Sequence, residues 1–134
     1  MADPVAVLTG TCAALRPGEP ADAVRGIVPG AVASPATVAE ASDVLGAAAV
    51  HGLAVLPRGA GTKLGWGTPP DRCDLVLDTT RLDRIIEHAA GDLVVRVQAG
   101  LAVNRLSAEL LASQGQLGGE PVHTECATKP RATC

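Results

Sequence analysis

The sequence predicts a domain of the α+β class, an α/β-like lobe in which a small mixed sheet is flanked by helices. An apolar stripe at helical spacing lies between short apolar runs at residues 31–34 and 53–56, which gives the order strand, helix, strand. Such a unit favours parallel strands joined by a right-handed crossover. Further runs at residues 84–87 and 93–98 are separated by a short glycine-containing stretch, which favours an antiparallel hairpin.

The elements follow in order along the chain. Residues 1–30 are rich in proline and glycine, so we expect a lead-in with one short helix near residues 6–15. The strand at residues 31–34 ends before Pro35. Thr37 and Glu40 then have the spacing of a capping box, which predicts a helix over residues 38–51, and Gly52 supplies its left-handed stop. The apolar stripe of this helix consists of Val38, Ala41, Val44, Leu45 and Ala48.

The run at residues 53–56 predicts a strand that is buried on both faces and ended by Pro57. A glycine-rich loop follows over residues 58–67, and residues 74–78 predict another short strand bounded by acids. Beyond the hairpin, Val103, Leu106 and Leu110 repeat at helical spacing. They predict a helix over residues 101–114, with Gly115 at the C-cap position.

Composition excludes several classes of protein. The 134 residues suffice for one domain with a modest core, and 47% hydrophobic with 19% charged residues is globular rather than disordered composition. The net charge of −3 gives no basic field for nucleic acid, and the single Trp leaves no stacking platform for bases. No apolar run is long enough to span a bilayer, and the N-terminus lacks the basic start of a secretory signal. We therefore expect a cytoplasmic protein.

Four cysteines occur, at positions 12, 73, 126 and 134, and no two form a C-x-x-C pair. This spacing argues against a disulfide framework or a zinc cluster, so free thiols and no metal site are expected. His123 and Cys126 have a ligand-like spacing, but two ligands do not make a site.

The loop at residues 58–67 is the most informative stretch for function. Its four glycines follow an apolar strand, so the backbone can turn sharply and successive N–H groups can enclose a phosphate. Arg58, Thr62 and Lys63 can add charge or a hydroxyl donor. The P-loop pattern is absent, and the last glycine of a Rossmann fingerprint comes one place late. On its own, such a loop could equally be a flexible surface loop.

Four segments together resemble the FAD-binding domain of the vanillyl-alcohol-oxidase and p-cresol methylhydroxylase (PCMH-type) superfamily. The resemblance lies in residues 32–40, 52–62, 74–78 and 93–100, taken in this order. It covers residues 27–116, the first part of a family domain. The loop at residues 58–67 most resembles that of the FAD-binding subunits of bacterial glycolate oxidases.

The resemblance implies that the glycine-rich loop binds the diphosphate of FAD through backbone amides. The cofactor-binding residues carried over are Arg58, Gly59, Ala60, Gly61, Thr62 and Lys63. Some family members attach FAD covalently through a histidine, and Thr62 stands at that position here, so non-covalent binding is implied. The implied activity is that of an FAD-linked oxidoreductase that oxidises a 2-hydroxy acid such as glycolate and passes electrons to a partner, for example an iron–sulfur or other oxidase subunit.

No residue is assigned a catalytic role. Asp78, Asp83, Glu87 and His88 are available, but each is expected to be a solvated loop residue.

The predicted organisation is a lead-in over residues 1–26, a partial FAD-binding domain over residues 27–116, and a disordered or aberrant tail over residues 117–134. The chain alone is expected to be inactive, because the walls around the flavin ring would be missing. A non-catalytic truncated remnant, and another FAD-linked oxidase or dehydrogenase of the same superfamily, are the alternatives.

Overall fold

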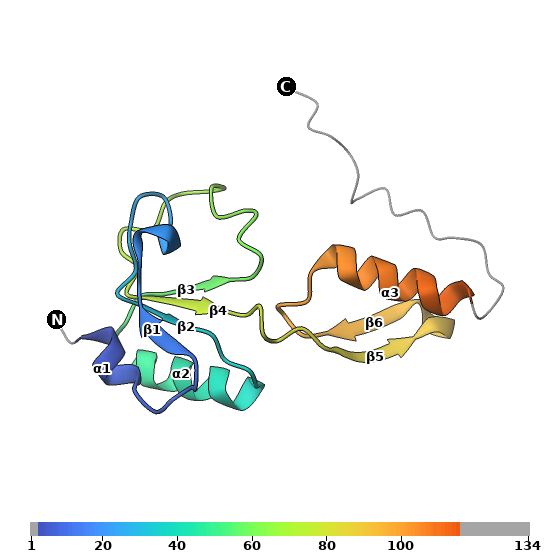
Figure 1. Cartoon of the computed structure of the whole chain (residues 1–134), viewed down its shortest axis with the longest axis horizontal. Coiled ribbons are helices and arrows are strands. Elements are labelled where there is room, and N and C mark those ends of the chain that lie inside the picture. The colour runs from blue at the N-terminus through green and yellow to red at the C-terminus, as the bar shows by residue number, and fades with distance from the viewer. Residues whose placement is uncertain (1–2, 116–134) are drawn as a thin grey trace, which may run out of the picture.

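The computed structural model describes residues 3–115, which fold as two successive parts (Figure 1). Residues 3–82 form a four-stranded sheet with the helices that pack on it, and residues 83–115 form a two-stranded hairpin and a helix. The predicted α+β class, with a small mixed sheet and flanking helices, is confirmed. The predicted tail over residues 117–134 lies outside the described residues.

The larger sheet has the strand order β1-β2-β4-β3. Strands β2 (Ala31–Ala33) and β3 (Val55–Arg58) each pair in parallel with β4 (Leu75–Asp78), and β1 (Leu15–Pro17) pairs antiparallel with β2. The strands that flank the first long helix are therefore parallel, as predicted, but β4 lies between them. The central position of β4 explains its continuous burial, since both of its faces and both of its edges are covered.

Strand β3 differs from its prediction. It begins at Val55 rather than Leu53, it continues through Pro57 to Arg58, and its residues are partly rather than fully buried. The physical reason is that β3 is an edge strand, paired only with β4. An edge strand tolerates a proline, because one side of its backbone has no ladder partner to lose.

Both faces of the larger sheet are covered. Helices α1 (Pro4–Leu8) and α2 (Val38–Val50) cover one face, where the buried residues are Leu8, Ala31, Ala33, Val44, Ala48, Leu75 and Leu77. The opposite face carries Val32, Val76 and Cys73, and Ile27 packs against them from a segment that includes the 3-10 helix η1 (Pro20–Asp22). Residues 3–26 thus pack within this lobe.

The first helix is shorter and earlier than predicted. Asp3 caps its start by accepting a hydrogen bond from the Val5 amide at 3.0 Å, and Gly10 stands in the left-handed conformation just after its end. Leu15, which the prediction placed in the helix, instead begins β1 and pairs with Ala33.

The limits of α2 agree with prediction within one residue. The Thr37 hydroxyl accepts from the Glu40 amide at 3.1 Å, and the Glu40 carboxylate accepts from the Ala36 amide at 2.7 Å, one residue before the expected partner. Gly52 has the predicted positive φ. Of the predicted stripe, Val44 and Ala48 are buried, whereas Val38 and Leu45 remain exposed.

The second part contains the predicted hairpin and helix. Strands β5 (Ile85–Ala89) and β6 (Val94–Val97) pair antiparallel around the 3-10 helix η2 (Ala90–Asp92), and α3 (Val103–Gly115) follows. None of residues 83–113 is buried. Within residues 3–115, no helix is long and apolar enough to cross a membrane.

Candidate functional site

The carboxyl ends of the three parallel strands meet at one edge of the larger sheet. Ligands of open α/β sheets bind at such edges, because the loops that leave the strands surround a crevice there. The glycine-rich loop, defined here as residues 58–67, starts at Arg58, the last residue of β3 (Figure 1). Arg58 is level with Asp78, the last residue of β4. The loop thus begins at the edge of the sheet where ligands of such sheets bind.

An open hollow of about 400 Å³ is lined by residues 57–64 of this loop. Across the described part of the chain, no acceptor is found for the backbone amides from Gly59 to Gly65. Gly61 has φ +72°, which a residue with a side chain rarely adopts. A concave row of unengaged N–H groups is a ready binding site for an anion.

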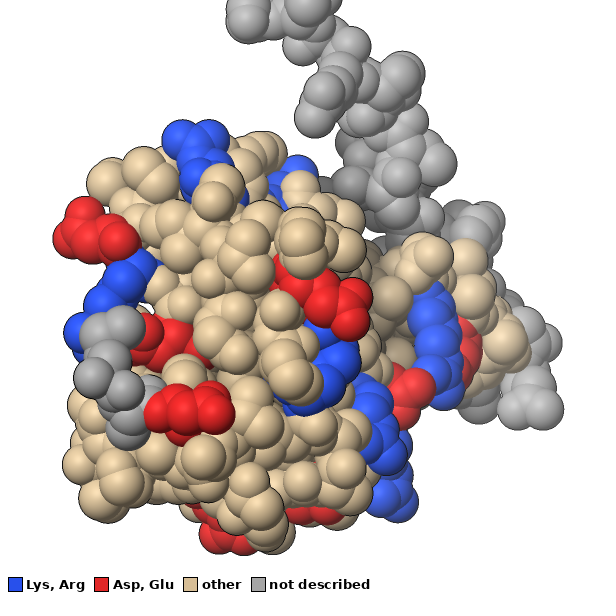
Figure 2. Space-filling model, turned by 60° about the vertical axis from the view of Figure 1, so that its left-hand side comes forward, with Lys and Arg blue, Asp and Glu red and all other residues tan. Residues whose placement is uncertain are grey.

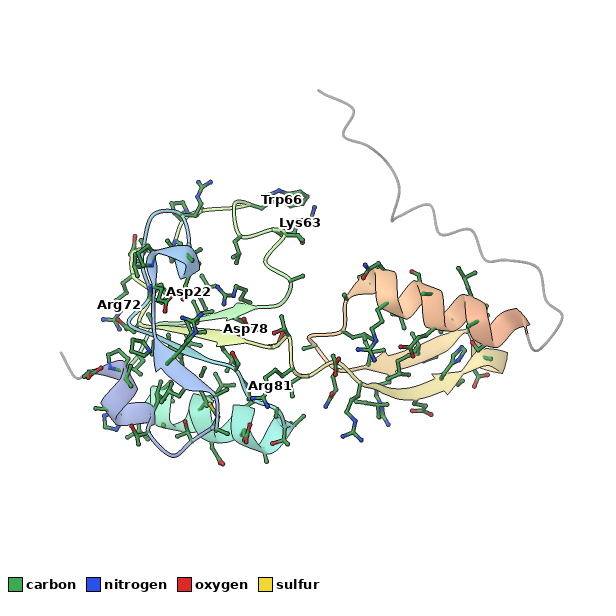
Figure 3. All side chains as sticks on the ribbon, in the orientation of Figure 1. Asp22, Lys63, Trp66, Arg72, Asp78 and Arg81 are labelled. Carbon is green, nitrogen blue, oxygen red and sulfur yellow. The ribbon has the colours of Figure 1, made fainter. Side chains whose placement is uncertain are left out.

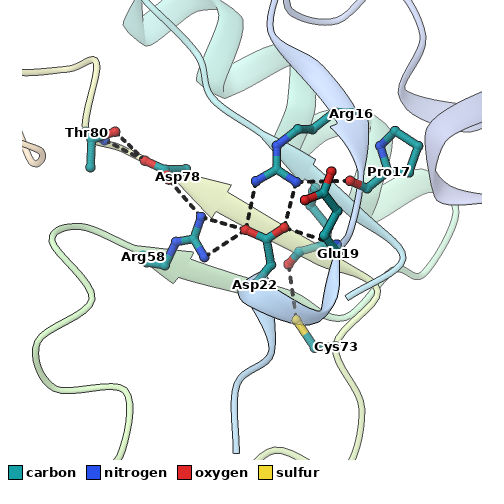
Figure 4. A network of polar contacts seen from close by, with 9 residues as sticks. Arg16, Pro17, Glu19, Asp22, Arg58, Cys73, Asp78 and Thr80 are labelled. Atoms are coloured by element: carbon teal, nitrogen blue, oxygen red, sulfur yellow. Dashed lines mark hydrogen bonds and ion pairs between the residues drawn. The ribbon is translucent and has the colours of Figure 1, made fainter. Parts of the chain in front are cut away.

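The Arg58 guanidinium is engaged within the protein rather than free for a ligand. Its Nη2 lies 2.9 Å from Asp78 Oδ2, and both terminal nitrogens lie 3.3 Å from Asp22 Oδ1 (Figure 4). The side chain is only 16% exposed. Two carboxylates therefore balance its charge.

Asp22 is the centre of this ionic network and is 5% exposed. Arg16 donates to both of its oxygens, at 2.6 and 2.8 Å, and the Glu19 amide donates at 3.1 Å (Figure 4). The hydrogen bonds from Arg16 hold the pKa of Asp22 far below its usual range, against the opposing effect of burial. Asp22 is therefore a permanent anion at neutral pH.

Asp78 completes the network at the end of β4. It accepts hydrogen bonds from the Thr80 amide at 3.0 Å and the Thr80 hydroxyl at 2.6 Å. Burial alone would raise the pKa of Asp78, but the hydrogen bonds from Thr80 and Arg58 lower it below the usual value. The carboxylate thus joins strand ends and, being ionised, is unsuited to act as a general acid.

Lys63 and Trp66 form an exposed pair on the loop (Figure 3). The Lys63 ammonium lies 4.0 Å from the centroid of the Trp66 ring, a cation–π contact, and Trp66 is 72% exposed. Lys63 is the one lysine among residues 3–115, and no carboxylate of that range forms an ion pair with it. It is therefore the cation on the loop that remains available to a ligand.

The remaining predicted acids belong to the second part of the molecule. Asp83 pairs with Arg105, and Glu87 with Arg96 at 3.2 Å, with roughly half or more of each side chain exposed. His88 is exposed as well. Figure 2 shows basic and acidic side chains intermixed over the visible face. Asp83 and Glu87 therefore belong to surface ion pairs. No group of three or more potential metal ligands occurs within residues 3–115.

Sequence reasoning missed two residues that contact the loop. Asp22 bonds Arg58 at the start of the loop, and the Arg25 guanidinium donates to the carbonyl of Gly65 near its end, at 3.0 Å. Both residues stand in the stretch predicted to be a lead-in. No local pattern identifies them, because their partners are 36 and 40 residues away in sequence.

The sequence matches the family described as FAD binding domain over residues 29–128. This match runs past Gln116, where the resemblance was expected to end. The chain is also 35% identical to the glycolate oxidase subunit GlcD of Bacillus subtilis over 74 residues, which cover 55% of this chain and 16% of that protein.

Solved structures share the fold at low sequence identity. A variant of berberine bridge enzyme matches with a TM-score of 0.65 and 16% identity, over 83% of this chain and 26% of its own. p-Cresol methylhydroxylase with substrate bound matches with a TM-score of 0.58 and 19% identity, over 66% of this chain and 18% of its own. The chain thus spans about a sixth to a quarter of the length of these relatives.

Proposed function

The chain belongs to the FAD binding domain family of FAD-linked oxidoreductases, and we propose that its glycine-rich loop holds the diphosphate of FAD. The observation that carries the proposal is the row of unengaged amides from Gly59 to Gly65, which borders an open hollow at the carboxyl edge of the sheet. Anionic groups bind such amides because each N–H can donate without first breaking a bond inside the protein.

Five of the six predicted residues have a direct role in this proposal. The amides of Gly59, Ala60 and Gly61 donate to the phosphate oxygens, and Thr62 adds a hydroxyl donor. Lys63 contributes the positive charge, because the charge of Arg58 is already balanced by Asp22 and Asp78. Binding is non-covalent, since the hydroxyl of Thr62 lacks the nucleophilic ring nitrogen through which a histidine attaches flavin.

We further propose that the whole protein oxidises a 2-hydroxy acid such as glycolate and works with a further oxidase subunit, for example an iron–sulfur protein. The support is the similarity to a glycolate oxidase subunit over 74 residues. FAD, when bound, supplies the hydride acceptor, and the residues of this chain bind and orient it. Another FAD-linked oxidase or dehydrogenase is the second candidate, because berberine bridge enzyme and p-cresol methylhydroxylase share the fold.

Two glycine substitutions test the loop as the cofactor site. Gly61 (φ +72°) and Gly67 (φ +76°) would be strained alike by a side chain, but only Gly61 lines the hollow. We expect Gly61→Ala to weaken the FAD affinity of the full chain by about tenfold or more, and Gly67→Ala by less than about twofold. Quenching of flavin fluorescence gives both dissociation constants. Equal losses in the two variants, or no flavin binding by the unaltered chain, would contradict the proposal.

A further inference from the structure

Both ends of the glycine-rich loop are held by the same short stretch of chain. Asp22 bonds the Arg58 guanidinium at the start of the loop. Arg25 donates to the Gly65 carbonyl near its other end, at 3.0 Å. Between these anchors the loop amides have no partner among residues 3–115. The stretch of residues 19–26, called the bracket below, thus contacts the loop near both of its ends.

The bracket is itself fixed internally. Helix η1 begins with two bonds between Glu19 and Asp22. The Asp22 carboxylate accepts from the Glu19 amide at 3.1 Å, and the Asp22 amide donates to the Glu19 backbone carbonyl at 2.8 Å. Val24 is 2% exposed and exchanges two backbone hydrogen bonds with Ile27, at 2.9 and 3.1 Å. The turn between them is therefore tight and anchored in the apolar layer beneath.

Arg25 stands in this turn with a φ of 55°, a left-handed conformation that is unfavourable for an arginine. Strained residues of this kind persist only where the surrounding structure holds them, and they gather at functional sites. Here the strained backbone carries the side chain that donates to Gly65.

We propose that the bracket fixes the distance between the two ends of the cofactor loop, with Asp22 and Arg25 as positioning residues; this inference rests on the proposed function of the loop. A glycine-rich loop loses much conformational freedom when it orders around a ligand. A loop that is already held at both ends loses less conformational entropy when it binds, so its affinity for FAD is higher.

Electrostatics and the bracket predict opposite effects of Asp22→Asn on the affinity for FAD. Asp22→Asn removes a negative charge near a site for a diphosphate, so electrostatics alone forecasts tighter binding. The bracket predicts weaker binding, because Arg58 loses one of its two carboxylate partners and the start of the loop loosens. The sign of the change in affinity therefore separates the two explanations.

The experiment measures FAD dissociation constants for the full chain and three variants. We expect Asp22→Asn and Arg25→Ala each to weaken binding by about fivefold or more. Arg72→Ala is the matched control, since Arg72 is also an exposed arginine that donates to a glycine carbonyl, that of Gly52, at 2.7 Å. Its affinity should stay within about twofold of the unaltered chain. Unchanged or tighter binding in both bracket variants would overturn the inference.

A second measurement needs no flavin. The chain has one Trp and no Tyr, so its ultraviolet fluorescence reports Trp66, which follows the anchored Gly65. We expect the fluorescence anisotropy of Trp66 to fall in Arg25→Ala and to stay unchanged in Arg72→Ala. Because Arg25 is exposed, this variant keeps the test valid even if Asp22→Asn does not fold. Equal anisotropy in all three proteins would contradict the bracket.

The two proposals fail in different ways. If Gly61→Ala leaves FAD affinity unchanged, the loop is not the cofactor site, and the proposed function and the effect of the bracket on FAD binding fall together. If Gly61→Ala weakens binding while Asp22→Asn and Arg25→Ala do not, the loop remains the site and the bracket alone is refuted.

Discussion

The two parts of the molecule bury very different amounts of apolar surface. In residues 3–82, helices cover one face of the sheet and the segment that contains η1 and Ile27 covers the other. This part holds all the buried side chains of the described chain. In residues 83–113 no side chain is buried, and several large apolar residues are exposed, namely Ile86, Leu93, Val94, Val103 and Leu111. The candidate cofactor loop belongs to the well-packed part.

This difference shows what supports the site. A binding loop needs a rigid base, because any misplacement of its amides lowers affinity. The base here is the end of the parallel sheet together with the ionic network of Asp22, Arg58 and Asp78. The apolar side chains of the hairpin and α3 are at most partly buried, as at Val95 and Leu106. The ion pairs of this part are exposed and contribute little to stability. We therefore expect the second part to open at a lower free energy than the first.

The largest expected effect compares core residues of the two parts. Leu75 is fully buried in the central strand, so Leu75→Ala should lower the free energy of unfolding by about 3 kcal/mol. Ile86 is 55% exposed in the hairpin, and Ile86→Ala should cost less than about 1 kcal/mol. Urea unfolding followed by circular dichroism measures both. Similar losses would show that the two parts share one core.

The next effect concerns the connection between the parts. The Gly100 amide donates to the Leu82 carbonyl at 2.8 Å, and a Cβ on Gly100 would lie only 1.7 Å from the Thr79 carbonyl oxygen. Gly100→Ala must therefore displace backbone and should cost about 1–3 kcal/mol. Gly91→Ala, where nothing lies within 4 Å, is the control. Hydrogen exchange should speed up at the amides of β5 and β6 in the first variant only, and equal exchange in both would contradict this.

A smaller effect depends on pH and arises in the first part alone. The pKa values of Asp22 and Asp78 are lowered in the folded protein, so their contribution is complete above the unfolded pKa of about 4. This contribution to the free energy of unfolding, about 1–2 kcal/mol in all, is lost as the pH falls from about 4 toward the pKa values of the folded protein. Urea unfolding between pH 7 and pH 3 measures the loss, and Asp22→Asn should reduce it. A loss of the same size in that variant would assign the effect to other carboxylates.

Much of the fold could be predicted because its signals are local. Thr37, Glu40 and Gly52 mark the ends of α2 by bonds within one turn, and the apolar run of β4 reports its burial directly. The position of β4 between β2 and β3 has no local signal, since packing decides strand order. The inclusion of Pro57 in β3 depends on that same order.

The sequence allowed the candidate loop to be predicted, but not the residues that hold the loop in place. The glycine pattern of residues 58–67 identifies a backbone that can enclose an anion. The partners of Asp22 and Arg25 are set by tertiary structure, and an acid or a base in a proline-rich stretch carries no periodicity that would reveal them. Likewise, only the structure shows that the charge of Arg58 is balanced internally.

The smallest effect is a gain in stability in the first part. Gly46 lies within α2, and a Cβ there would meet nothing within 4 Å. Gly46→Ala should therefore raise the free energy of unfolding by about 0.5–1 kcal/mol, because glycine loses more backbone entropy in a helix. Gly52→Ala should lower it, since Gly52 has φ +63°. Thermal unfolding of the two variants gives both signs, and a destabilised Gly46→Ala would show that the helix surface is tightly packed there.

The strand order also sets the sequence in which the lobe can assemble on the ribosome. Strands β2 and β3 leave the exit tunnel before β4, yet neither has its parallel neighbour until residues 75–78 emerge. Helix α2 can form early, because its caps are local. The last strand of the larger sheet to be synthesised is inserted at its centre, and it carries Asp78, a partner of Arg58. Translation thus delivers the candidate cofactor loop first and the strand that anchors it afterwards.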